Sequence, residues 1–489
     1  MKQANPAIIR AVFAIPAVSA HRAACAIPAV SARRAACAPS ALLLAFLVSF
    51  LTGAGCPTWA ENLQLEYQVS QKQVSAPNPE LKSVGSSTTE SNSAGTLSVL
   101  LDDHSYREDS GHPQIYDFAN KTCCLIKPDG KSYSQTSLYS LVAFVDTEIR
   151  NRQMLGSLLA HSGLEAKAIT TFDQLWAAIE LGITMPGAPE NPGIIIEEQD
   201  GNIVCTYKDK VLTRVKLGEP CNSGKEMYTK FLVYNMRLHP LIRERIASTG
   251  RLCKEIDFLV ARPSGAIDCI SMRLTKSTPT SNKASLDQSM KRVFDSPSLV
   301  PFQEKLLSEP KSWTMPTRAE TLTATQKFMD ANNFLDAALT LAEYSLCTGD
   351  HAAADQKEIG LKLEQDKNVK LVFQKPDNTS IEALKEVLKK LQSIDTSTLS
   401  KGYIIDIFKA DVMDSLQQDG SELLLNALKN NMLLTGVYRD LGDFWAERYE
   451  TVKAWECYEL ARRLNASHPI LEPVNKREQR LEKEHPEFF

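Results

Sequence analysis

The sequence lacks an excess of charge of either sign. Its 489 residues include 55 Lys and Arg against 59 Asp and Glu, which gives a formal net charge of −4. Binding to nucleic-acid phosphates requires a clear basic excess, so the charge balance argues against a nucleic-acid partner. Hydrophobic residues make up 43% of the chain and charged residues 23%, which is typical of a globular protein. The length exceeds what one hydrophobic core normally spans and predicts two folded domains.

The sequence also lacks the short motifs that mark common catalytic and cofactor sites. It contains no HExxH, G-x-S-x-G, CxxC or GxGxxG string. The nearest phosphate-loop string, residues 218–226, has one residue too many between its glycines and carries Glu226 where a Ser or Thr would bind magnesium. We therefore predict no cofactor and no recognisable enzyme class. A catalytic set assembled from residues far apart in the sequence would leave no such motif, and this alternative stays open.

One cluster combines carboxylates with imidazoles, the groups that most often bind metal ions. Asp102, Asp103, His104 and His112 lie close together in the sequence. Their spacing fixes no coordination geometry, and such clusters are usually solvated turn residues. No metal site is predicted.

Residues 1–60 lack acidic side chains altogether and have the parts of a secretory signal. Basic residues precede an apolar run over residues 41–51, which is too short for a comfortable membrane span, and small residues follow. We expect cleavage after Ala60 and an exported protein, either periplasmic or secreted. A lipidated Cys56 and an uncleaved leader are the alternatives, and only these would bring the protein into contact with a membrane.

Cysteine bears on the same question of compartment. Three of the 11 cysteines lie in the leader, which leaves 11 − 3 = 8 in the mature chain. An even number permits disulfides in an exported protein, and Cys205 with Cys221 and Cys253 with Cys269 are plausible pairs. Buried free thiols are the alternative, since connectivity cannot be read from sequence.

Residues 61–275 alternate between short strand patterns and helical patterns. Strands are expected on both sides of the Pro128–Gly130 turn and again between residues 193 and 216, with a long loop at residues 70–95. This predicts an α+β domain with a largely antiparallel sheet. The stretches DDHSYRED and YDFANKTCCLIKPDGKSYS resemble the curved half-barrel sheets of periplasmic lipoprotein carriers. That resemblance implies a concave sheet that holds an apolar ligand or a lipid.

A linker with short helices is expected at residues 276–316. The third part of the chain, residues 317–489, is predicted to form helical hairpins. Its clearest unit is YRDLGDFWAERYETVKAWECYELARRLNASHP, residues 438–469. The spacing resembles a tetratricopeptide repeat, whose pattern places large and small residues so that two antiparallel helices pack closely. The residues that match the repeat core are Tyr438, Leu441, Gly442, Trp445, Ala454, Tyr458 and Ala461.

Other segments support a tandem array of such hairpins. Leu424 precedes Tyr458 by 34 residues and Ile404 precedes Tyr438 by the same number, which is the repeat length of the family. A capping helix is expected at residues 473–489. The resemblance implies a groove that binds a protein or peptide partner, with Lys409, Arg439 and Asp443 as candidate contacts.

The sequence therefore favours an exported, non-catalytic protein whose helical repeats bind a partner in the cell envelope. The alternatives are an envelope carrier of lipids or lipoproteins that uses the sheet domain, and an enzyme with an unrecognised site.

Overall fold

The computed structural model describes residues 62–75, 93–161, 174–208, 210–261, 267–308, 313–353, 356–373 and 380–489. The predicted leader, with Cys56 and the cleavage position after Ala60, lies outside the described residues. Among the helices that are described, none is long and apolar enough to cross a membrane.

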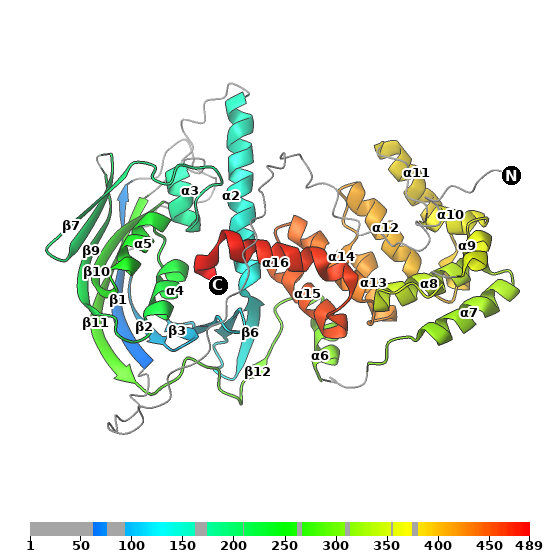
Figure 1. Cartoon of the computed structure of the whole chain (residues 1–489), viewed down its shortest axis with the longest axis horizontal. Helices are drawn as coiled ribbons and strands as arrows, with labels where there is room; N and C mark the ends of the chain where they lie inside the picture. The colour runs from blue at the N-terminus through cyan, green and yellow to red at the C-terminus, as the bar shows by residue number, and fades with distance from the viewer. Residues whose placement is uncertain are drawn as a thin grey trace, which may run out of the picture.

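The chain folds into a sheet part followed by a helical part, which confirms the predicted fold class (Figure 1). In the described residues the sheet has 12 strands in the order β12-β6-β5-β4-β3-β2-β1-β11-β10-β9-β8-β7. Neighbouring strands pair antiparallel, except that β12 runs parallel to β6. The strands are β1 (Asn62–Ser75), β2 (Ser93–Leu101), β3 (Ser105–Asp109), β4 (Gln114–Asp117), β5 (Thr122–Ile126), β6 (Ser132–Ser137), β7 (Ile194–Gln199), β8 (Asn202–Tyr207), β9 (Lys210–Pro220), β10 (Arg251–Ala261), β11 (Ile267–Thr280) and β12 (Lys291–Arg292).

Four helices are inserted between strands of the sheet. They are α2 (Leu138–His161), α3 (Gln174–Leu181), α4 (Lys225–Asn235) and α5 (Pro240–Ser248). The sheet curves, and α4 and α5 lie inside the curve (Figure 1). Phe231 of α4 packs there against Tyr67 of β1 and Tyr106 of β3, with ring centroids 6.1 and 6.0 Å apart. The concave face is therefore filled by an aromatic core.

The strand boundaries differ from the predictions in three places. β1 continues to Ser75 and β2 begins at Ser93, so both ends of the predicted loop at residues 70–95 belong to strands. β11 continues to Thr280, because its polar end pairs with the first residues of β1, as in Thr280 opposite Asn62. The predicted linker therefore begins later than residue 276. β3 was not predicted at all, since one of its two inward positions carries Glu108 instead of an apolar residue.

None of the eight described cysteines forms a disulfide. The predicted pairs are wrong because strand register separates them: Cys205 lies opposite Thr213, and Cys269 lies opposite Leu259. Cys123 and Cys124 belong to different hydrophobic clusters on the two faces of β5, as the alternation of a strand requires.

The helical part is a series of short helices, consistent with helical repeats. The tightest pairs are α14 with α15, α7 with α8 and α12 with α13. Its helices are α6 (Val300–Ser308), α7 (Arg318–Asp330), α8 (Phe334–Thr348), α9 (Lys357–Leu363), α10 (Lys367–Phe373), α11 (Ile381–Gln392), α12 (Tyr403–Ser415), α13 (Ser421–Asn430), α14 (Thr435–Glu447), α15 (Thr451–Asn465) and α16 (Glu472–Glu484), followed by the 3-10 turn η6 (Pro486–Phe488).

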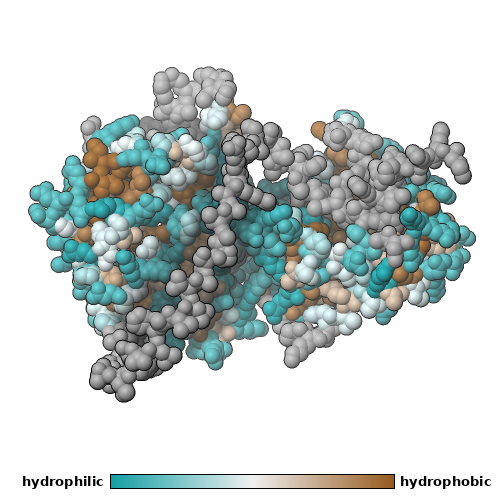
Figure 2. Space-filling model, viewed as in Figure 1, coloured by the Kyte–Doolittle hydropathy of each residue, from teal (hydrophilic) through white to brown (hydrophobic). Residues whose placement is uncertain are grey.

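The two parts meet where α15 and α16 pack against α2 and β6 (Figure 1). Ion pairs cross this contact, among them Lys121 with Glu482 and Arg292 with Glu459. The visible face of the molecule is mostly hydrophilic, with hydrophobic patches on the upper outer part of the sheet domain (Figure 2).

Candidate functional site

A cavity of about 620 Å³ lies between the helices of the sheet domain and the end of the helical part. Cavities of this size commonly hold small molecules. Its walls come from α2, α4, α5, the loop after α3 and residues 484–487, and no strand contributes. The apolar wall includes Ile183, Met185, Leu232, Val233, Pro240 and Ala247.

Charged residues of both signs line the cavity, namely Arg150, Arg243, Glu244, Glu484 and Glu487, and of these Arg243 of α5 is the buried one. This helix begins at Pro240, and the side chain of His239 caps it by accepting a hydrogen bond from Leu241 N. Arg243 lies one turn into the helix and is only 4% exposed. Its Nη1 donates to Val233 O at 3.3 Å and its Nη2 donates to Gly182 O at 2.6 Å. These carbonyls belong to the C-terminal ends of α4 and α3, where helices carry partial negative charge.

The charge of Arg243 is only partly compensated. In the described part of the chain, no carboxylate lies within ion-pair distance of its guanidinium group. Burial lowers the pKa of Arg243 to about 10, although the nearby charges of Glu487 and Glu244 act in the opposite direction. Its guanidinium carbon lies 5.9 Å from the centre of the Phe488 ring. An anionic group in the cavity would supply the missing counter-charge.

Glu484, His485 and Glu487 line the cavity from the helical part, and residues 485–489 are bound there by α4. Lys230 of α4 donates from Nζ to the main-chain oxygens of Pro486 at 3.2 Å, Glu487 at 3.0 Å and Phe489. Tyr234 donates from its hydroxyl to Phe488 O at 2.9 Å, and the two rings lie 5.4 Å apart. Burial lowers the pKa of Lys230, with Glu226 and Glu487 opposing that shift.

Beside the cavity, Asp146 of α2 joins the two parts of the molecule. It is 2% exposed. Its carboxylate accepts from Arg150 Nε at 2.8 Å, from Arg480 Nη2 at 3.1 Å and from His485 Nε2 at 3.3 Å. Burial raises the pKa of Asp146, but hydrogen bonds from His485 and Arg150 outweigh it and hold that pKa below its ordinary value.

Asp146, Glu484 and His485 place their ligand atoms within 4.8 Å of one another. Arginine side chains already satisfy this cluster, because Arg150 and Arg480 both pair with Asp146 and Arg150 also pairs with Glu484. The arrangement is thus an ion-pair network between the two parts. Of the cluster noted in the sequence, Asp102, Asp103 and His104 connect β2 to β3 and His112 lies between β3 and β4; Asp102 accepts from Asp103 N and Ala284 N.

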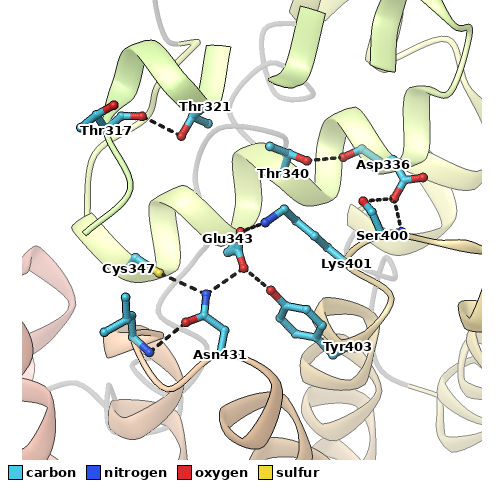
Figure 3. Close-up of polar contacts among 11 residues, drawn as sticks. Thr317, Thr321, Asp336, Thr340, Glu343, Cys347, Ser400, Lys401, Tyr403 and Asn431 are labelled. Carbon is cyan, nitrogen blue, oxygen red and sulfur yellow. Dashed lines mark hydrogen bonds and ion pairs between the residues drawn. The ribbon is translucent and has the colours of Figure 1, made fainter. Parts of the chain in front are cut away.

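The helical part holds a second buried polar network, centred on Glu343 of α8 (Figure 3). Glu343 accepts hydrogen bonds from Lys401, Tyr403 and Asn431, the last at 2.7 Å. Two helical turns away, Asp336 accepts from Ser400 N and Oγ at 2.9 and 2.8 Å.

Burial raises the pKa of the Cys347 thiol to about 12, with the Asn431 hydrogen bond opposing, so this thiol is protonated and unreactive. Burial likewise raises the pKa of Tyr403 to about 12. The network fixes α8 to the segments before α12 and α14 and offers no activated nucleophile.

The repeat-core residues named from the sequence are all buried. They lie in the hairpin of α14 and α15, where a Cβ at Gly442 would come within 3.0 Å of Ala454 O. Such contact explains why only glycine fits there. The buried residues are Tyr438, Leu441, Gly442, Trp445, Ala454, Tyr458 and Ala461.

The candidate contact residues of the helical groove are buried or partly buried, whereas a contact surface requires exposed side chains. Arg439 is 1% exposed and Asp443 is 7% exposed, and they pair with each other at 2.8 Å inside the array. The expectation of an exposed contact surface at these two residues is therefore wrong. Lys409 is partly buried and pairs with Asp406 at 3.1 Å.

The sequence did not indicate Arg243 or Lys230 as site residues. Arg243 lies between Ile242 and Glu244 in an ordinary amphipathic helix, and Lys230 precedes Phe231 in another. α5 begins at His239–Pro240, and proline at the first position is typical of a helix start. No local pattern shows that a charged residue one turn later faces inward.

Comparison with known proteins adds little. No family model matches the chain, and no curated protein matches it. Among solved structures, a similar chain comes from a study of lipid-protein interactions in lipovitellin; it is 8% identical, with a TM-score of 0.17. The match covers 87% of this chain and 56% of that chain. Likeness at this level carries no argument about function.

Proposed function

We propose that this protein is a non-catalytic binding protein that holds a small amphiphilic molecule in the cavity of its sheet domain. The observation that carries the proposal is the meeting of an apolar wall with the buried guanidinium of Arg243 in a cavity of about 620 Å³. The apolar wall would take an acyl or similar chain, and Arg243 would take a carboxylate or phosphate group.

The binding site differs from the concave sheet that the sequence resemblance implied. The aromatic core around Phe231 fills the concave face, so the proposed ligand lies among helices on the other side of α4. Thr229, Leu232 and Val233 of α4 line the cavity, whereas Tyr228 and Phe231 pack toward the strands.

The same proposal gives the helical part the role of a tetratricopeptide-like scaffold in an exported protein. The 34-residue spacing supports it, because Ile404 and Tyr438 are both buried within the first four residues of α12 and α14. The composition of residues 1–60 supports export. A peptide partner would contact exposed residues of this array and not Arg439 or Asp443.

Binding of defined amphiphiles tests the proposal. We expect the purified full chain to bind dodecanoate and dodecyl phosphate more tightly than dodecanol in isothermal titration calorimetry. Arg243→Met should weaken binding of both anions by about 10- to 100-fold, the value of a hydrogen bond to a charged group, about 1.5–3 kcal/mol. It should leave dodecanol binding unchanged. Arg245→Met is the matched control, because Arg245 lies on the same helix but pairs with Glu198 at the surface.

A second pair of variants tests the location of the binding site and leaves Arg243 unchanged. Ala247→Trp would fill the cavity, whereas Ser248→Trp places the same ring on the adjacent, exposed position. Loss of binding in the first variant alone supports the site. Equal binding in both, or an absence of binding by the wild-type chain, would overturn the proposal.

A further inference from the structure

The cavity has one wall that differs from the others in how it is attached. Residues 485–489, here called the closing segment, follow the end of α16 at Glu484. His485 and Glu487 line the cavity, and the ring of Phe488 lies against Arg243. The closing segment therefore contacts the group that we assign to the anion.

The closing segment is held to the sheet domain by side chains: Lys230 and Tyr234 of α4, and on α2 Asp146, which accepts from His485, and Tyr139, whose ring centre lies 5.0 Å from that of Phe489. Its main-chain oxygens accept from Lys230 and Tyr234, and its own amides bond within the segment, as in Phe488 N to His485 O at 3.1 Å. No main-chain hydrogen bond of the described residues joins it to a strand or helix of the sheet domain. It can leave as a unit while keeping its own turn.

The helix that precedes the closing segment is attached more firmly. Arg480 and Glu484 of α16 join the Asp146 and Arg150 network, and Glu482 pairs with Lys121. These contacts lie on α2 and on the turn that precedes β5, away from Lys230. Release of the closing segment would break the hydrogen bond from His485 to Asp146 but keep the ion pairs of Arg480, Glu482 and Glu484, which leave α16 docked.

We propose that the closing segment opens and closes the cavity, and that ligand binding and closure stabilise each other. This inference rests on the proposed function, since it concerns the regulation of the same site. A ligand that contacts Arg243 also contacts the wall formed by His485 and Glu487, so it favours the closed state. By thermodynamic reciprocity, the closed state binds the ligand more tightly. The exchange of ligand then requires opening.

Hydrogen exchange of the ligand-free chain tests opening by itself. We expect the amides of Phe488 and Phe489 to exchange at least about 10-fold faster than that of Leu481 in α16, measured by mass spectrometry with residue-level fragmentation, since local opening precedes global unfolding. Equal rates would mean that the segment moves only with α16 and would overturn the inference. This result is independent of any ligand.

Ligand kinetics test the coupling. The probe is a dansyl-labelled undecanoate, followed by stopped-flow fluorescence. Phe488→Ser should raise both the association and the dissociation rate of the probe by about 10-fold, because it removes the ring that contacts Tyr234 and Arg243. Tyr234→Phe removes only the hydrogen bond to Phe488 O and should change both rates in the same direction by less. Glu459→Gln, which breaks the distant pair with Arg292, is the control.

The two proposals fail in different ways. If the wild-type chain binds no probe, the proposed function fails, and the exchange experiment still decides whether the segment opens. If the probe binds but Phe488→Ser leaves its association rate unchanged, the segment is a fixed wall and the inference fails alone.

Discussion

Glu108 of β3 is a buried carboxylate in the sheet. It is 8% exposed, and its Oε2 has no hydrogen-bond partner in the described part of the chain. Burial raises the pKa of Glu108 to about 7, with a hydrogen bond to Asn235 opposing that shift. The folded state thus binds a proton that the unfolded state has already released between about pH 4.5 and 7. Stability contributed by this proton is present below pH 4.5 and is lost as the pH rises toward 7.

Glu108→Gln should therefore stabilise the protein in a pH-dependent way. We expect little change in the free energy of unfolding at pH 4.5 and a gain of up to about 3 kcal/mol at pH 8, from urea denaturation at both pH values. Glu197→Gln, an exposed position on β7, is the control and should change neither value. A gain of the same size at both pH values would contradict this account.

Gly442 is the second residue whose role follows from contact distances. A Cβ there would lie 2.7 Å from Cδ1 of Tyr458 and 3.0 Å from Ala454 O. Gly442→Ala gains about 1 kcal/mol of helix propensity, but overpacking of this kind costs about 1–3 kcal/mol, and the close backbone contact favours the upper value. Thermal unfolding should show a net loss of about 1–2 kcal/mol. Gly95→Ala, which meets nothing within 4 Å, should be tolerated; an unchanged melting temperature for both variants would refute the contact.

At the scale of elements, the sequence predicted α14 and α15 because large and small residues recur at helical spacing. The sequence could not predict that the side chains of Arg439 and Asp443 point into the core, since charged residues normally face solvent. Their spacing of four residues allows them to neutralise each other inside the array, and the Tyr458 hydroxyl donates to Asp443 Oδ1 at 2.6 Å. β3 escaped prediction for a related reason, because Glu108 occupies an inward position.

The buried pair of Arg439 and Asp443 should contribute to the stability of the hairpin of α14 and α15. Arg439→Met removes the guanidinium that Asp440 and the buried Asp443 share, although Tyr458 still donates to Asp443, and should cost about 3–5 kcal/mol of unfolding free energy. The double variant Arg439→Met with Asp443→Asn removes both charges and should recover a large part of that loss. Denaturation of the two single variants and the double variant forms a cycle that measures the coupling. Additive losses would show that the pair is not coupled.

At the scale of the whole molecule, the cavity depends on contacts that no sequence window contains. Asp146 meets Arg480 and His485 from the far end of the chain, and each of these residues alone resembles a surface charge. The sequence predicted the fold class and most elements because these depend on local periodicity. The docking of α16 on α2, and with it the cavity, depends on pairing across the chain.

Asp146 also predicts how the molecule unfolds as a whole. Asp146→Asn removes the charge that Arg150, Arg480 and His485 share. The side chains of Arg150 and Arg480 are 39% and 47% exposed, so water compensates part of the loss and the cost lies below the ~3–5 kcal/mol of a fully buried pair. This cost weakens the contact between the two parts. Calorimetry should therefore show the sheet domain and the helical part melting in separate transitions, where the wild-type chain melts in one. Glu472→Gln, which breaks an exposed pair with Lys476 within α16, should leave a single transition. A single transition in Asp146→Asn, merely shifted to lower temperature, would mean that the apolar contacts of α15 and α16 suffice to couple the two parts.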